Sequence, residues 1–293
     1  MTIQIPNKLG VHALVWVGGW SHAECREAIQ NTVEAGYDLI EIPALDPSLI
    51  DTKHTLATLK EFGIKAACSL GLSFDADINN EDSAIVAKGE AKLMAALDVV
   101  AAIEGDYLGG VLFSALGKYS HAATEKSRAN SVASLKRLAI AAQAKGITIG
   151  LEPVNRYESN LINTIDQAVA MIKDIGEPNV KVHIDIYHMN IEEQDLASPI
   201  INNAEHIGYV HIGASHRGGL GTGNVDFDEL FGALAKINYK GVITYESFSS
   251  AIVHTDLSLA LAIWRNLWTE NKPMALSARK YMVEHIVRAN KLA

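Results

Sequence analysis

The stretch GITIGLE, residues 146–152, decides the fold because it holds in seven residues a pattern that the chain repeats. A glycine ends the preceding helical segment, a short apolar run predicts a buried strand, and an acid stands at the end of that strand. Apolar runs end in the same way at Asp185, His211 and Glu246. From Glu152 onward these residues are 33, 26 and 35 positions apart, which is about the length of one strand–helix unit.

Strand-like and helix-like segments alternate along the whole chain. Strands are predicted at residues 9–16, 39–42, 64–70, 107–113, 147–151, 180–184, 207–210 and 242–245. Helical patterns cover residues 21–35, 48–62, 83–103, 124–145, 164–175 and 198–204, and two further helices are predicted to begin at Asp226 and near Leu257. Glycines at positions 36, 63, 146, 208 and 241 recur just before strands.

No stretch rich in Ser or Pro interrupts this series, so nothing in the sequence marks a domain boundary. We therefore predict an α/β fold, a single (β/α)8 TIM barrel over residues 1–293, in preference to an open doubly wound sheet. The segment from Asn271 to Ala293 predicts an extra amphipathic helix at the carboxyl end. We expect that helix to cover the barrel or to meet a partner subunit.

The composition excludes several classes of function. The chain is 48% hydrophobic and 20% charged, as folded globular proteins are. Its formal net charge of −9 and its lack of a basic run argue against a nucleic-acid partner. Neither a signal peptide nor an apolar window long enough for a membrane span is present, so we expect a cytoplasmic protein. Cys25 and Cys68 lack metal-type spacing and predict no disulfide framework.

The four strand-end residues predict a metal site. In a closed barrel the carboxyl ends of the strands converge, so Glu152, Asp185, His211 and Glu246 are expected to meet. Three carboxylates at close range repel each other unless a cation lies between them. An oxygen-rich set with one imidazole favours Mn²⁺, Mg²⁺ or Co²⁺ over a structural zinc ion. Taken singly, each acid has the alternative of a solvated or capping group, but four in register favour the metal site.

A second set of polar residues follows the same strands. Glu158 lies in the loop after Glu152, His188 is three residues past Asp185, and Arg217 is six residues past His211. Loops at the carboxyl end of a barrel are where the hydroxyl groups of a polyol would be held. The alternatives are an ordinary loop ion pair for Glu158 and Arg217, and a structural histidine for His188.

Apolar residues are candidates for the wall of the pocket. Trp16 ends the first predicted strand and Phe248 follows Glu246 by two residues, and aromatic rings can stack on the C–H faces of a sugar. Cys68 ends part of the third strand and is included among the candidate substrate contacts. Core packing is the alternative for all three. The glycine-rich segment 218–223 lacks the context of a phosphate loop and predicts a flexible loop over the site.

In these motifs the chain resembles the ketose 3-epimerases of the xylose isomerase-like barrel superfamily, which include D-tagatose, D-psicose and L-ribulose 3-epimerases. The resemblance covers essentially the whole chain and is carried by GLEPVNRYE (150–158), HIDIYHMN (183–190), HIG (211–213), GTG (221–223) and YESF (245–248), together with Arg217. The departures lie in the first strand and around Trp16, Cys68 and Phe113.

The resemblance implies Mn²⁺ or Co²⁺ held by Glu152, Asp185, His211 and Glu246. It implies that Glu158, His188 and Arg217 hold the O1–O3 end of the sugar, and that the protein is a homodimer or homotetramer.

The residues and the resemblance together predict epimerisation of a free ketose at C3, with substrates such as D-tagatose, D-fructose, D-psicose, L-ribulose or L-xylulose. Glu152 and Glu246 are expected on opposite sides of the barrel mouth, so one removes the C3 proton and the other returns a proton to the far face of a cis-enediolate. The alternatives are an aldose–ketose isomerase on the same barrel, a barrel DNA-repair endonuclease and a non-catalytic sugar-binding protein. An endonuclease would need more His and Asp ligands and a basic face.

Overall fold

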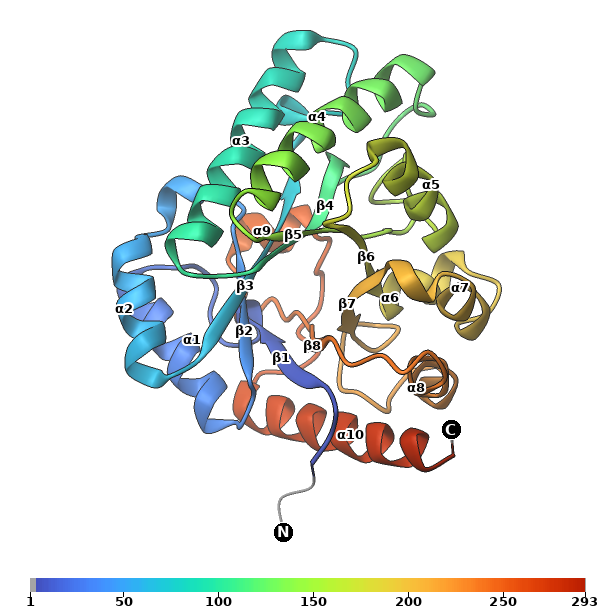
Figure 1. Ribbon diagram of the computed structural model, residues 1–293. Coiled ribbons are helices and arrows are strands. Elements are labelled where there is room, and N and C mark those ends of the chain that lie inside the picture. Colours follow the sequence, from blue (N-terminus) through green and yellow to red (C-terminus); the bar gives the residue numbers. More distant parts are fainter. Residues whose placement is uncertain (1–3, 293) are drawn as a thin grey trace.

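The computed structural model describes residues 4–292, in which eight parallel strands close into a barrel in chain order (Figure 1). The strands are β1 (Lys8–His12), β2 (Leu39–Pro43), β3 (Lys65–Leu72), β4 (Tyr107–Ala115), β5 (Thr148–Leu151), β6 (Val180–Asp185), β7 (Ile207–Ile212) and β8 (Val242–Tyr245). The barrel closes where β1 pairs with β8, with Lys8 opposite Val242. The predicted TIM barrel is therefore confirmed.

Helices surround the barrel, and most begin where the sequence places a capping side chain. They are α1 (His22–Glu34), α2 (Thr52–Phe62), α3 (Ser83–Ala102), α4 (Glu125–Gln143), α5 (Ile165–Ile175), α6 (Ile186–Glu192), α7 (Ala197–Asn202), α8 (Phe227–Lys236), α9 (Thr255–Ala260) and α10 (Asn271–Leu292). Ser21 and Thr164 cap α1 and α5 with reciprocal hydrogen bonds, as their position predicts.

Local side-chain hydrogen bonds change three of the predicted elements. The first strand ends at His12 instead of residue 16, because the His12 ring accepts a hydrogen bond from the Leu14 N–H and a 3-10 turn, η1 (Ala13–Val15), follows. The helix predicted from residue 48 begins at Thr52, since Asp51 caps it. The helix predicted near Leu257 is the short α9, and α6 was not predicted at all.

The extra carboxyl-terminal helix is confirmed as α10, which lies along the outside of the barrel next to α8 (Figure 1). Its apolar side is buried at Ala275, Ala278, Met282 and Ile286. The Tyr37 hydroxyl donates to the Ala275 carbonyl at 2.8 Å and ties the helix to the segment before β2. The predicted end at Ala293 lies outside the described residues.

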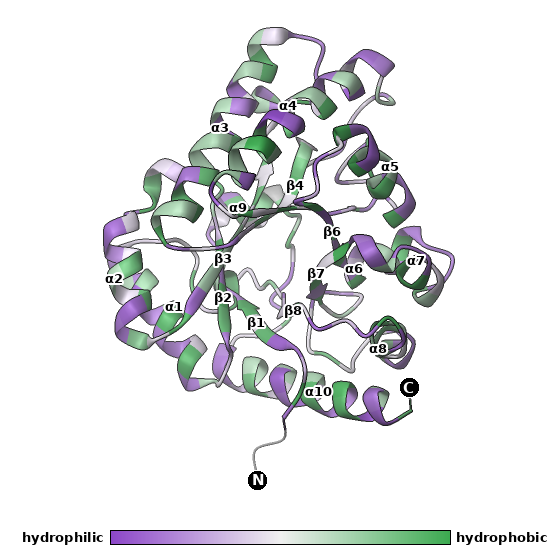
Figure 2. Cartoon of the chain, in the orientation of Figure 1, coloured by the Kyte–Doolittle hydropathy of each residue, from purple (hydrophilic) through white to green (hydrophobic). Residues whose placement is uncertain are grey.

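The hydropathy of the chain follows this architecture, because the strands are mostly hydrophobic and the outer faces of the helices are mostly hydrophilic (Figure 2). β6 and β7 contain clearly hydrophilic stretches (Figure 2). Both strands nevertheless lie inside the protein, and they carry His183, Asp185 and His211, all buried. Buried polar side chains need partners or a ligand, so this part of the barrel is where function is expected.

One glycine sets the approach of two strands near those residues. Gly110 in β4 has a φ of 110°, and a Cβ atom there would lie 2.3 Å from the Leu70 carbonyl oxygen. Its own carbonyl accepts the Glu152 N–H at 3.1 Å. The glycine therefore lets β4 fit against β3 while it fixes the backbone at the end of β5.

Of the helices within residues 4–292, none combines the length and hydrophobicity needed to cross a lipid bilayer.

Candidate active site

The structure brings the four predicted strand-end residues together at the carboxyl end of the barrel. The Nδ1 atom of His211 lies 3.6 Å from Oε1 of Glu152 and 3.7 Å from Oε2 of Glu246. Asp185 is paired in register with His211, and ligand atoms of Asp185, His211 and Glu246 lie within 4.8 Å of one another. All four side chains are buried. The arrangement is a compact group of three carboxylates around one imidazole.

The His211 ring has the orientation that a metal ligand requires. Its Nε2 atom lies 2.8 and 2.9 Å from the two carboxylate oxygens of Glu41, a fully buried residue of β2. Its Nδ1 atom is buried and has no hydrogen-bond partner in the described part of the chain. A carboxylate that holds one nitrogen of a histidine leaves the other free for a cation. The donor set therefore fits a divalent metal ion.

Electrostatics support the same conclusion. Burial, reinforced by repulsion from the neighbouring carboxylates, raises the pKa of Glu152 to about 7 and that of Asp185 to about 6. Burial also opposes the ionisation of Glu246, but the charges of Arg217 and His211 outweigh it and lower that pKa. Nearby carboxylates, with Glu41 foremost, overcome burial and raise the pKa of His211 well above its usual value. A proton or a cation must accompany these acids.

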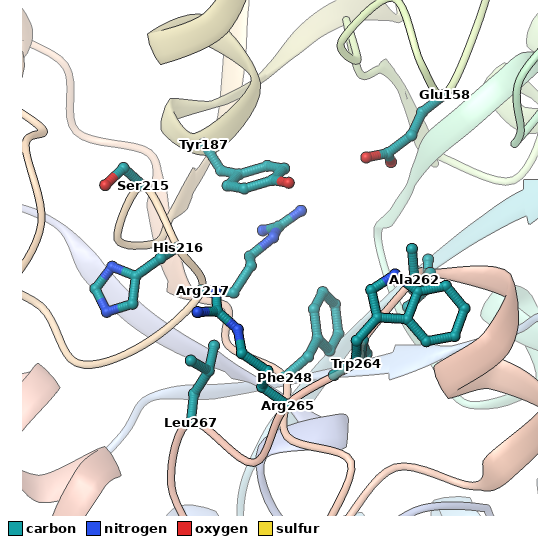
Figure 3. A pocket seen from close by; sticks show the side chains of 12 residues that line it. Glu158, Tyr187, Ser215, His216, Arg217, Phe248, Ala262, Trp264, Arg265 and Leu267 are labelled. Atoms are coloured by element: carbon teal, nitrogen blue, oxygen red, sulfur yellow. The ribbon is translucent and has the colours of Figure 1, made fainter.

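Arg217 supplies one positive charge to this group. Its Nη1 atom donates to Oδ2 of Asp185 at 3.0 Å and also to Oε2 of Glu246. The guanidinium lies 4.0 Å from the centre of the Tyr187 ring and 5.1 Å from that of Phe248 (Figure 3). The Arg217 backbone has a φ of 61°, in the left-handed region that residues other than glycine seldom adopt. The Ser247 hydroxyl donates to its carbonyl and holds it there.

His188 and Glu158 are linked through one asparagine. The Asn155 amide donates to Oε1 of Glu158 at 2.7 Å and to Nδ1 of His188 at 2.9 Å, and the Asn155 backbone N–H also points at that nitrogen. His188 therefore carries its proton on Nε2, which lies 3.6 Å from Asp185 and 4.0 Å from Glu152. Burial and the Arg217 charge lower the pKa of His188 well below its usual value, so the ring is a neutral donor.

Two neighbouring cavities, which share two lining residues, lie beside the group. The inner chamber, about 80 Å³ in volume, is lined by Glu152, His211, Glu246, His12 and Ser69 and otherwise by apolar residues and glycines. The outer chamber, about 290 Å³, is lined by Glu158, Tyr187, Arg217 and the segment 261–267 after α9 (Figure 3). Phe248 and Leu261 line both chambers. A small polar molecule in these chambers would lie directly against the acidic group.

Of the three residues predicted to form the wall of the pocket, one lines the cavities and two lie in the hydrophobic core. Phe248 lines both chambers, as a wall residue should. Trp16 and Cys68 line neither chamber, because both are packed in the hydrophobic core. Burial raises the pKa of the Cys68 thiol far above its usual value, so it is not a nucleophile. For Trp16 and Cys68 the structure therefore favours the packing role over the predicted contact with substrate.

The glycine-rich segment 218–223 does not lie over the site either. Cβ atoms built at Gly219 and Gly221 would lie close to Met274 and Tyr281, so the segment runs against α10. Neither chamber is lined by it.

Sequence reasoning missed Glu41, His12 and Ser69. Glu41 interrupts the apolar run of residues 39–42, which is the signal that identified Glu152, but it lies inside the strand and not at its end. His12 lies inside the longer first strand, residues 9–16, that the sequence predicts. Ser69 lies within an apolar strand, where a serine by its sequence position alone does not indicate a functional site.

A closed parallel barrel with buried carboxylates and a histidine at its carboxyl end defines the class of the protein, a xylose isomerase-like TIM barrel, and the model of that family matches residues 29–267. The chain is 50% identical over 279 residues to L-ribulose 3-epimerase of Methylomonas sp. (strain DH-1), covering 94% of this chain and 98% of that protein. It is 47% identical over 275 residues to ketose 3-epimerase of Arthrobacter globiformis, covering 94% and 95%.

A solved structure agrees with these relatives. D-allulose 3-epimerase from Methylomonas sp., crystallised in complex with D-allulose, has a TM-score of 0.94 and 48% identity, with 97% of this chain and 99% of that chain covered. The chain belongs to the ketose 3-epimerase family, whose members are carbohydrate isomerases.

Proposed function

We propose that this protein inverts the configuration of free ketoses at C3 with a divalent cation held by Glu152, Asp185, His211 and Glu246. The observation that carries the proposal is the Nδ1 atom of His211, which has no hydrogen-bond partner within residues 4–292 and lies 3.6 Å from Glu152 and 3.7 Å from Glu246. These two acids come from β5 and β8, three strands apart around the barrel. Mn²⁺ and Co²⁺ are the first candidates and Mg²⁺ the next, because the three carboxylates suit hard cations and the imidazole favours transition metals among them.

The two glutamates carry the proton transfers in this proposal. A C–H bond next to a ketone becomes acidic when the negative charge on the sugar oxygens is stabilised, which is the chemistry that a bound divalent cation supplies. Glu152 or Glu246 removes the C3 proton from one face of the sugar, and the other acid returns a proton to the opposite face.

The remaining polar groups hold the sugar in this scheme. His188 presents the N–H of Nε2 toward the acidic group, and Glu158 and Arg217 line the outer chamber beside it. We assign these three to the O1–O3 end of the ketose. Phe248, which lines both chambers, is assigned to the C–H face of the sugar. Closing the sugar between these groups excludes water from the reacting carbon.

The proposal is tested by product analysis on a panel of ketohexoses and ketopentoses with Mn²⁺ added. D-allulose and L-ribulose are tested first, because two of the similar proteins are named as 3-epimerases of these sugars. The expected product is the C3 epimer in each case, reached from either direction. Aldose products without epimer would assign the function to a 1,2-isomerase instead.

Assembly and location remain predictions of this proposal. A homodimer or homotetramer is expected, and light scattering on the purified protein measures it directly. A cytoplasmic location agrees with two buried cysteines that form no disulfide with each other. Fractionation of the source cells tests it.

A further inference from the structure

The interior of the barrel holds a histidine that the scheme above does not use. His183 lies in β6, two residues before Asp185, and is fully buried. Alternate residues of a strand point to the same side, so His183 lies one layer deeper in the barrel than Asp185. Neither ring nitrogen of His183 has a hydrogen-bond partner within residues 4–292. Buried polar atoms normally have partners, so two free nitrogens on one ring indicate a place for a ligand.

We propose that Glu152, His183 and His211 form a second cation position, deeper in the barrel, which takes a divalent ion that prefers nitrogen ligands, such as Cu²⁺ or Zn²⁺. The inference rests on the proposed function in one respect, because it takes Glu152, Asp185, His211 and Glu246 as the position of the catalytic cation.

The three side chains of the deeper position are close enough to share one ion. One ligand atom each of Glu152, His183 and His211 lies within 4.8 Å of the other two. The two imidazole rings have centres 4.1 Å apart and planes that meet at 77°. Nitrogen and oxygen ligands bind zinc at about 2.0–2.2 Å, so two ligands of one ion are at most about 4.4 Å apart. Small side-chain rotations therefore suffice to bring the three atoms around a cation.

Of the buried histidines within residues 4–292, only two have a nitrogen free to bind a cation. These histidines are His12, His183, His188 and His211. Nδ1 of His12 accepts a backbone N–H and Nδ1 of His188 accepts the Asn155 amide, so the proton of each neutral ring is on Nε2. A protonated nitrogen cannot bind a metal ion. His211 offers Nδ1, and His183 offers whichever nitrogen does not carry its proton.

The surroundings of His183 indicate which nitrogen that is. A Cβ atom at Gly109 would lie 2.6 Å from Nδ1 of His183 and 3.0 Å from the Tyr107 hydroxyl oxygen. The glycine thus leaves one space that both groups border, and the hydroxyl also has no partner within residues 4–292. Tyr107 can accept the Nδ1–H and leave Nε2 for the ion, as the partners of ligand histidines commonly do. The Tyr209 ring packs against His183 with ring centres 4.7 Å apart.

The two cation positions differ in the chemistry of their ligands. The catalytic set has three carboxylates and one imidazole, whereas the deeper set has one carboxylate and two imidazoles. Nitrogen ligands favour Cu²⁺ and Zn²⁺ over Mn²⁺, and carboxylates suit Mn²⁺ and Mg²⁺. Both sets use Glu152 and His211, so the two positions cannot be filled together. An ion in the deeper position therefore excludes the catalytic cation.

The experiment uses metal-free protein with Cu²⁺ alone, at one equivalent, and compares the wild type with three variants. His183→Leu removes both nitrogens at similar side-chain size, and His183→Phe removes them but keeps a ring. Asp185→Asn is the matched control, since it alters the catalytic set and not the deeper one. Pulsed electron paramagnetic resonance counts the imidazoles bound to Cu²⁺, and calorimetric titration gives the affinities for Cu²⁺ and for Mn²⁺. The Tm of each variant verifies that it is folded.

The wild type should show two imidazoles on Cu²⁺, and the His183 variants should show one. Their Cu²⁺ affinity should fall by about tenfold or more, since even the loss of a group that orients a ligand costs that much. Their Mn²⁺ affinity should stay within about twofold of the wild type, and Asp185→Asn should instead weaken Mn²⁺ more than Cu²⁺.

A single imidazole on Cu²⁺ in the wild type would overturn the inference. Copper held by surface histidines would overturn it too, because the spectrum and the affinity would then be the same in the wild type and in the His183 variants. These measurements involve no sugar, so turnover of a ketose at C3 with Mn²⁺ tests the proposed function separately.

Discussion

The two halves of the barrel differ in what they present to the site. Glu152, Asp185, His211 and Glu246 lie at or next to the carboxyl ends of strands β5 to β8, and the loop after β7 adds Arg217, so most of the charge gathers in one half. Strands β1 to β4 contribute mainly the apolar wall of the inner chamber, with His12 and Ser69 as its polar groups. Mutations in the two halves should therefore have different effects, because one half gathers most of the charged groups and the other supplies mainly apolar surface. Changes in the first half should stop turnover, and changes in the second should alter preference.

The largest effect should come from removal of the metal, which would break the charged half as a whole. Chelation with EDTA should abolish activity, and Mn²⁺ or Co²⁺ should restore it, because the buried carboxylates need a cation. The apparent Tm should fall when the metal is removed and rise again when metal is added back. Full activity in protein shown by elemental analysis to be free of metal would contradict the proposal.

Single changes to the paired acids should have the next largest effect. Glu152→Gln and Glu246→Gln should each lower kcat by at least about a hundredfold, the lower range for a positioned acid–base group. Both residues are also proposed ligands, so metal content must be measured alongside. A variant that keeps its metal and turns over at a near-normal rate would rule out the two-acid scheme.

Glu41 tests whether the two halves depend on each other, since it is a residue of β2 that acts on His211 in β7. Glu41→Ala should weaken metal binding by about tenfold to a hundredfold, the usual range for a group that orients a ligand histidine. Glu41→Gln keeps an acceptor for the ring and should lose less. Titration calorimetry on metal-free protein measures both, and equal affinities in wild type and Glu41→Ala would remove Glu41 from the site.

Cys68 should give the smallest effect, because it is a core residue of the apolar half. Cys68→Ala should leave kcat/KM for every ketose within about twofold of the wild type. The lost packing should lower stability by about 1 kcal/mol, seen as a Tm lower by roughly 2 °C. A change in preference among ketoses would instead return Cys68 to the list of substrate contacts.

The sequence predicted the charged half better than the apolar half, and the reason is physical. Each of Glu152, Asp185, His211 and Glu246 is a polar residue at the end of an apolar run, and the closed barrel brings strand ends together whatever the details. Glu41 escaped notice because it lies inside its strand. The wall depends on side-chain directions near the ends of β1 and β3, and a single hydrogen bond from Leu14 to His12 ended the first strand early. Trp16 follows η1 directly and is buried in the core, the alternative that the sequence left open for it.

The most direct test of the central claim follows hydrogen at the reacting carbon. The protein, Mn²⁺ and D-allulose or L-ribulose are incubated in D₂O, and the sugars are analysed by NMR spectroscopy. If Glu152 and Glu246 exchange a proton at C3 from opposite faces, deuterium should appear at C3 alone, together with the C3 epimer and without aldose. Deuterium at C1 with aldose as product would contradict the account, as would the complete absence of exchange in metal-loaded protein.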